Sequence, residues 1–154
     1  AREFKKPIVT LRPFSVYGPY EEKTRFIPTI VKAVIEDKPI NLTPGKQRRD
    51  FIYIKDVVDM YIKTLSYGKR LSGQILNMGA GIEYTNDEVV KVLFQITEKK
   101  VKIEKGAYPT RIWDTQHWVA NISKAKTLLK WKPKFSLEKG LEETYKWYLK
   151  LYKK

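Results

Sequence analysis

Short runs of β-branched and aromatic residues alternate with amphipathic helical stretches along this chain, and that alternation limits the folds open to it. Residues 8–14 form a strand-like run that ends before a Gly-Pro turn. Residues 26–36 then place apolar side chains at helical spacing, namely Ile27, Ile30, Val31, Val34 and Ile35. Two short strands at 40–42 and 51–54 precede a second helical stripe at 57–65. Strands that alternate with helices are typical of an α/β fold.

The second half of the chain continues this pattern. Residues 74–78 predict a strand, and the Gly-Ala-Gly at 79–81 predicts a tight turn after it. Thr85 and Glu88 have the spacing of a capping box, in which each side chain bonds the other residue's amide, so a helix should begin there. The remaining expected elements are a strand at 101–104, a long loop at 106–119, and helices near 121–130 and 136–152.

Composition limits the class of protein. The chain has 154 residues, 42% of them hydrophobic, which is enough to bury the core of one domain. No apolar run approaches the roughly 20 residues that span a bilayer. The absence of cysteine excludes disulfides and thiolate metal sites, and we expect a cytoplasmic protein with no metal site. Because the first residue is Ala1 rather than Met, we also expect a processed or truncated chain.

The formal charge of +14 raises the question of nucleic-acid binding. Residues 121–154 hold ten lysines and three glutamates, but the lysines are dispersed between apolar positions. Solvated faces of amphipathic helices explain this distribution, and no nucleic-acid-binding motif accompanies the charge. The solvated interpretation is favoured, and a basic nucleic-acid-binding domain stays open as an alternative.

Catalytic candidates are few. His117 is the single histidine, and no nucleophile motif accompanies it, so a polar or surface contact is favoured. The turn at 79–81 lacks the third glycine of a dinucleotide-binding turn, because Tyr84 stands in its place. The glutamate pairs at 21–22 and 142–143 lie beside lysines and should be solvated charges. We therefore predict no catalytic residue within 1–154.

Arginines are the strongest ligand-binding candidates, because a planar guanidinium matches a diphosphate bidentately. Arg49 enters the strand at 51–54, and Arg111 lies in the unpatterned loop. Each also has an acidic neighbour with which it could form an ion pair. The sequence chemistry alone leaves both alternatives open.

Several segments stand in a distinctive order. They are Leu-Arg-Pro-Phe-Ser-Val-Tyr-Gly-Pro at 11–19, Phe-Ile-Pro at 26–28, Gly-Lys-Gln-Arg-Arg-Asp-Phe at 45–51, Asn-Met-Gly at 77–79, and a final segment from Asn121 to Pro133. Together they resemble the extended short-chain dehydrogenases, the NAD-dependent epimerases and dehydratases of nucleotide sugars. The resemblance covers nearly the whole chain. It departs from the family pattern at Ser15, where an asparagine is usual.

The resemblance implies roles for single residues. Arg49 and Arg111 would grip the diphosphate, and Ser15 would donate one hydrogen bond to it. The implied substrate-binding set is Ser15, Phe26, Ile27, Pro28, Arg49, Asn77 and Arg111. The implied cofactor contacts are Pro13, Phe14, Ser15 and Val16, at one edge of an NAD site.

The family's glycine-rich turn and Tyr-x-x-x-Lys pair do not occur in residues 1–154. The resemblance therefore implies a single C-terminal substrate-binding domain, 1–154, in which 1–20 match the end of the Rossmann half. It would be a small mixed α/β lobe plus the last strands of a Rossmann-type sheet whose main part is absent. We expect a nucleoside-diphosphate sugar as ligand and NAD only in the complete enzyme. A separate Rossmann half or a homo-oligomer would cover exposed apolar surface.

A second hypothesis is a non-catalytic binding or interaction module that has kept the phosphate-binding arginines. The sequence leaves the nucleotide base, the sugar and the reaction open, because these choices depend on residues outside the motifs above.

Overall fold

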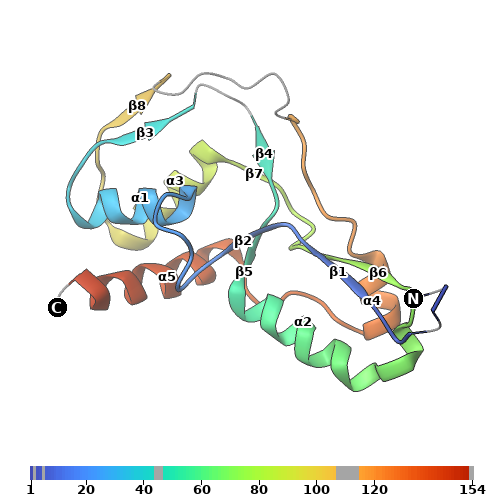
Figure 1. Ribbon diagram of the computed structural model, residues 1–154. Helices are drawn as coiled ribbons and strands as arrows, with labels where there is room; N and C mark the ends of the chain where they lie inside the picture. Colours follow the sequence, from blue (N-terminus) through green and yellow to red (C-terminus); the bar gives the residue numbers. More distant parts are fainter. Residues whose placement is uncertain (2, 5, 44–46, 107–114, 153–154) are drawn as a thin grey trace.

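The computed structural model describes residues 1, 3–4, 6–43, 47–106 and 115–152 (Figure 1). In chain order its elements are β1 (Thr10–Pro13), β2 (Ser15–Tyr17), α1 (Phe26–Ile35), β3 (Ile40–Leu42), β4 (Arg48–Arg49), β5 (Phe51–Tyr53), α2 (Ile54–Tyr67), the 3-10 helix η1 (Gly68–Leu71), β6 (Ile75–Met78), β7 (Tyr84–Thr85), α3 (Asn86–Thr97), β8 (Ile103–Lys105), α4 (Ser123–Leu129) and α5 (Leu137–Tyr152). The expected mixed α/β fold is confirmed.

The strands pair two by two. β1 pairs with β6, β2 with β5, and β3 with β8, each in parallel, whereas β4 and β7 are antiparallel. In Figure 1, β2 and β5 lie in the middle, with α1, α3 and α5 on one side and α2, α4, β1 and β6 on the other. The central pair therefore joins two regions that each have their own core.

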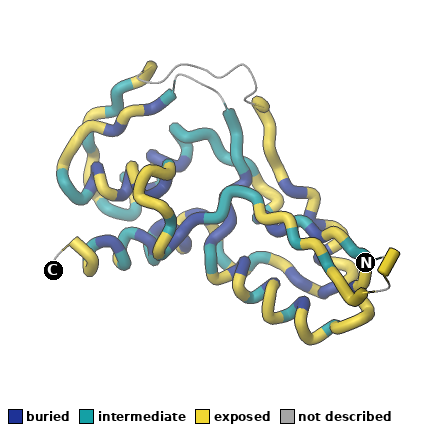
Figure 2. Tube along the Cα trace, in the orientation of Figure 1, coloured by how far each residue is buried: buried dark blue, intermediate teal, exposed yellow. Residues whose placement is uncertain are grey.

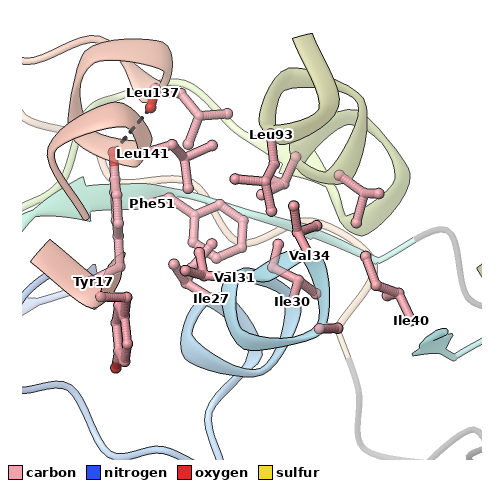
Figure 3. Close-up of a cluster of buried hydrophobic side chains, with 14 of the residues drawn as sticks. Tyr17, Ile27, Ile30, Val31, Val34, Ile40, Phe51, Leu93, Leu137 and Leu141 are labelled. Carbon is pink, nitrogen blue, oxygen red and sulfur yellow. Dashed lines mark hydrogen bonds between the residues drawn. The ribbon is translucent and has the colours of Figure 1, made fainter. Parts of the chain in front are cut away.

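The first core lies between α1, α3 and α5. Buried side chains of α1 meet Leu93 of α3 and Leu141 of α5 (Figure 3). Tyr17 of β2 is also buried there, and its hydroxyl donates a hydrogen bond to the carbonyl of Leu137, 3.3 Å away. Parallel strands covered by helices bury apolar runs of this kind.

The second core lies between α2, α4 and β6. Met60 of α2, Leu76 and Met78 of β6, and Leu129 of α4 are fully buried in it, together with Trp131. Exposed positions recur along the outer faces of the helices (Figure 2). None of the helices in the described ranges has the length and hydropathy needed to cross a membrane.

The strand predicted at 8–14 is split in the structure. Phe14 donates its amide to the carbonyl of Met78 at 2.9 Å, but the next amide, of Ser15, donates to the carbonyl of Asp50 at 3.0 Å. The chain thus leaves β6 and joins β5 at this point. A pattern of β-branched residues predicts an extended segment, but it does not predict where the segment changes partner.

Most other predicted helices and strands are confirmed to within a few residues, and residues 107–114 of the predicted loop lie outside the described residues. The capping box at Thr85 is present: its hydroxyl accepts from the amide of Glu88 at 3.2 Å, and the Glu88 carboxylate accepts from the amide of Thr85 at 2.7 Å. The short pair of β4 and β7 was not predicted. Two residues per strand are too few to show a period.

Candidate functional site

A cleft beside β2, β5 and the start of α1 is the candidate site. It contains a cavity of about 460 Å³, within the range of roughly 300–1,000 Å³ usual for small-molecule sites. Four residues of the predicted substrate set line this cavity: Ser15, Phe26, Ile27 and Arg49. Seven further polar or charged side chains line it, namely Glu21, Thr24, Arg25, Thr29, Asn41, Thr43 and Asn86.

Strand register brings two of these residues together. Ser15 begins β2 opposite Phe51 of β5, so Arg49, two positions before Phe51, reaches the same cavity. One guanidinium nitrogen of Arg49, Nη1, donates to the carbonyls of Arg48 and Thr115, each at 2.9 Å. The guanidinium carbon lies 5.9 Å from the centre of the Trp118 ring. These contacts hold the side chain in one orientation, which reduces the entropy that a bound ligand would have to offset.

The start of α1 forms another wall. The helix begins at Phe26, and its N-cap residue, Arg25, makes no side-chain capping bond. The first amides of a helix lack partners within the helix, and here they lie at residues that line the cavity. The Phe26 ring lies 6.0 Å from the Phe51 ring. Pro28, also in the predicted set, is buried on α1 and is not among the lining residues.

Asn77 does not join this cavity. Its side-chain oxygen accepts from Nε of Arg12 at 3.0 Å, and its nitrogen donates to the carbonyl of Asn121 at 3.1 Å. It lines a separate cavity of about 380 Å³ with Arg12 and Lys124. Arg111 and its neighbour Asp114 lie outside the described residues.

The predicted cofactor contacts lie where the chain passes from β1 to β2. Pro13 pairs with Met78 in the register of β1 and β6. The Phe14 ring meets the Trp118 ring edge-on at 6.3 Å. Ser15 and Val16 line the main cavity. The amides of Phe14 and Ser15 already donate to carbonyls within the fold, so they are not available as donors to a cofactor.

Asp50 is a structural residue that the sequence did not single out. Its buried carboxylate accepts from the amides of Ala80 at 2.6 Å, Gly81 at 2.9 Å and Ala120 at 3.0 Å. Burial raises the pKa of this carboxyl, and the three amides oppose that shift. The Gly-Ala-Gly turn thus holds a side chain of this chain, in agreement with the structural interpretation of that turn. The sequence feature that could have indicated Asp50 is its position directly after Arg49.

The turn also needs glycine at its first position. A Cβ on Gly79 would lie 2.4 Å from the Cβ of Ala120 and 2.7 Å from Oδ2 of Asp50. Such close approach leaves no room for a larger residue. Close packing against Ala120 and Asp50 therefore explains why glycine stands at the first position of this tight turn.

Glu21 contradicts the expectation of solvated charge. Only 15% of its side chain is exposed, and its Oε2 is buried without a hydrogen-bond partner among the described residues. Burial raises its pKa to about 7, against the opposing effect of Arg25. Glu21 also lines the main cavity. The sequence pattern missed it because Glu21 lies in a turn, where neither helical nor strand periodicity indicates burial.

The other charged candidates behave as predicted. His117 is exposed, and its Nδ1 lies 2.7 Å from Oε1 of Glu83. Glu142 and Glu143 form exposed ion pairs with lysines. Across the described ranges no group of three or more acidic, histidine or cysteine side chains could hold a metal ion.

Comparison with known proteins places these features in a family. Residues 1–79, just over half of the chain, match the NAD dependent epimerase/dehydratase family. The chain therefore belongs to this family.

Individual relatives agree with this assignment. The chain is 36% identical over 142 residues to a UDP-glucuronate 4-epimerase of Thermodesulfobacterium geofontis, a match that covers 91% of the chain and 42% of that protein. A solved UDP-glucuronic acid 4-epimerase from Bacillus cereus, in complex with UDP-glucuronic acid and NAD, aligns with a TM-score of 0.89 at 32% identity. That alignment covers 98% of this chain and 48% of that one. A dTDP-glucose 4,6-dehydratase from Bacillus anthracis with NAD aligns at 0.85 and 30% identity, over 97% and 47% of the two chains. The chain thus spans about half the length of these relatives.

Proposed function

We propose that this chain is the nucleotide-sugar-binding lobe of an NAD-dependent epimerase or dehydratase. The single observation that supports this most is the convergence of Ser15, Phe26, Ile27 and Arg49 on one cavity. These residues come from three different elements, and the same four were implied as ligand contacts by their sequence motifs.

The chemistry of the cavity suits a nucleoside-diphosphate sugar. Arg49 and Arg25 both line it, so two guanidinium groups can meet the two charges of a diphosphate. The Ser15 hydroxyl can donate a further hydrogen bond. Asn41 and Asn86 offer amide donors and acceptors suited to the edge of a base. Arg111 stays a predicted second phosphate ligand.

The reaction itself would need groups beyond those identified in residues 1–154. When bound, NAD would supply hydride acceptance and return at the sugar. Pro13, Phe14, Ser15 and Val16 would contact one edge of it. The proposed role of this chain is to hold the nucleotide and so orient the sugar toward that chemistry.

A partner surface is also part of the proposal. One face of α2 carries apolar residues at i, i+3, i+4 and i+7, namely Val58, Tyr61, Ile62 and Leu65, and each is at least 48% exposed. Such a stripe favours docking to a Rossmann half, on the same polypeptide or a separate one, or to a second copy of this chain.

Calorimetric titration tests the function. We expect micromolar binding of one or more uridine, thymidine, cytidine or guanosine diphosphate sugars, with a preference for one base. Replacing Arg49 with alanine should weaken binding roughly 100-fold, because a charge-assisted bidentate contact is lost, at about 1.4 kcal/mol per tenfold. Arg49→Lys should recover only part of the loss.

Arg70→Ala is the matched control, since this arginine lies on η1, outside the cavity lining. Its affinity should equal that of the original chain, and circular dichroism should show that all variants are folded. Tight, steeply salt-dependent binding to unrelated oligonucleotides, without sugar-nucleotide binding, would contradict the proposal and support the nucleic-acid alternative.

A further inference from the structure

Glu21 lies where two cavities adjoin. The first is the main cavity of the candidate site, of about 460 Å³, which we call the nucleotide cavity. The second, of about 560 Å³, is lined by apolar groups of Val16, Pro19, Tyr20 and Ile54. Both cavities share Val16, Tyr17, Glu21 and Arg25 in their lining, so Glu21 borders both of them.

The turn that presents Glu21 has an unusual backbone. Tyr20 has a φ of +66° although it is not glycine, and its side chain is 87% exposed at the rim of the second cavity. Left-handed backbone at a non-glycine residue costs about 1–2 kcal/mol and tends to persist at ligand-contacting sites. The strain therefore accompanies a turn that forms one wall of both cavities.

The polar side chains that line the nucleotide cavity differ in chemistry. Asn41 and Asn86 lie in its lining as amides that can both donate and accept, whereas Glu21 is a carboxyl group. A nucleotide sugar has its base and its sugar on opposite sides of the diphosphate. Amide side chains suit the base edge, and a carboxyl group suits sugar hydroxyls. The sugar would therefore lie beside Glu21.

The groups facing Glu21 come from its own turn and from α5. Arg25 Nε lies 3.8 Å from Glu21 Oε1, and the backbone at Gly18 favours the charged form of the carboxyl. From α5, the Tyr148 hydroxyl lies 3.5 Å from the Glu21 carbonyl and donates to it. Burial outweighs these neighbours and raises the pKa of Glu21 to about 7. Both the neutral and the charged form are thus populated near neutral pH.

We propose that Glu21 is a specificity residue that admits uncharged sugars to the cleft and excludes uronates. This inference rests on the proposed function and names its sugar class. Arg25 and Arg49 can match the two diphosphate charges. The carboxylate of a uronate would be a third anionic group, and it would lie beside the Glu21 carboxylate instead of a cation. A bound diphosphate also disfavours the charged form of Glu21 and raises its pKa further, so binding takes up a proton.

The sign of the resulting pH dependence follows from this coupling. The free carboxyl loses its proton as the pH rises through about 7, while the liganded carboxyl retains it to higher pH. Affinity for UDP-glucose should therefore be highest on the acid side and fall roughly five- to tenfold between about pH 6 and about pH 8. Nucleotide sugars have no group of their own that titrates in this window.

The test is calorimetric titration of the 154-residue chain with UDP-glucose and UDP-glucuronate, which share base and diphosphate. At about pH 8 we expect the uronate to bind at least roughly tenfold more weakly than the glucoside. Glu21→Gln should bind both with similar affinity and show no pH dependence. Glu104→Gln, an exposed glutamate on β8 paired with Lys102, should behave like the unchanged chain.

A second measurement does not depend on the variant. Titrating UDP-glucose in buffers of different ionisation enthalpy should show net uptake of up to about one proton near neutral pH. Equal affinity for the two sugars, or a pH dependence that persists in Glu21→Gln, would overturn this inference and leave the proposed function standing. Absence of binding by any nucleotide sugar would overturn both.

Discussion

At the scale of single residues, the Asp50 carboxylate joins three parts of the chain. This carboxylate accepts hydrogen bonds from the amides of Ala80, Gly81 and Ala120. The backbone carbonyl of Asp50 accepts a further bond from the amide of Ser15. Arg49, the proposed phosphate ligand, directly precedes it. The position of Arg49 thus depends on a residue that holds the turn after β6 and the segment before α4.

Asp50→Asn should therefore destabilise the chain. The asparagine side chain keeps one acceptor oxygen but turns a donor toward amides that are themselves donors. A buried amide left unpaired costs about 1–3 kcal/mol, and we expect a loss of that size in the free energy of unfolding. Urea denaturation followed by circular dichroism measures it.

Asp59→Asn provides the comparison, because Asp59 pairs with the exposed Lys134 at the surface. Exposed ion pairs contribute about 0–1 kcal/mol, so its effect should be small. Equal midpoints for the two variants would show that the Asp50 bonds do not stabilise the fold.

At the scale of elements, α5 packs against β2 through a single glycine. A Cβ on Gly140 would lie 2.0 Å from the Tyr17 hydroxyl oxygen and 2.8 Å from its Cζ. Tyr17 is buried, and its hydroxyl bonds the carbonyl of Leu137 one turn earlier (Figure 3). Glycine inside a helix is otherwise unfavourable, so close packing explains its presence here.

Gly140→Ala sets two effects against each other. Helix propensity favours alanine by up to about 1 kcal/mol, whereas overpacking costs about 1–3 kcal/mol. We expect a net loss of about 1–2 kcal/mol in unfolding free energy, measured by urea denaturation. Adding Tyr17→Phe should reduce the penalty, with a coupling of at least about 0.5 kcal/mol.

Lys150→Ala, at an exposed position of the same helix, should change stability by less than about 0.5 kcal/mol. If Gly140→Ala stabilised the chain, the contact between α5 and β2 would be looser than described.

Elements with a strong period were predictable from sequence, and those defined by long-range pairing were not. The stripe of α1 and the capping box of α3 are local signals, and both are confirmed. The change of partner between β1 and β2 depends on β5 and β6, which lie far along the chain. The two-residue pair of β4 and β7 likewise forms only after the fold brings 48–49 near 84–85.

At the scale of the whole molecule, the candidate cleft borders the region in which two cores meet. α1, α3 and α5 surround one core and α2, α4 and β6 the other, and β2 and β5 run between them (Figure 1). Side chains from separate elements can therefore converge on one cavity without being adjacent in sequence.

Sequence motifs indicated only part of the lining of the candidate site. The segments around Ser15, Phe26 and Arg49 pointed to residues that share the cavity. Asn77, marked in the same way, lies in a different cavity. Glu21 had no motif and was predicted to be solvated, because its burial results from tertiary packing of a turn.

The most direct test of the central claim is a titration of the isotope-labelled chain with UDP-glucose, followed residue by residue through amide NMR signals. We expect the amides of Ser15, Phe26, Ile27 and Arg49 to shift together with one dissociation constant, while the amide of Asn77 stays in place. Shifts confined to the surroundings of Asn77, or spread along the lysine-rich α5, would contradict a nucleotide site in this cleft.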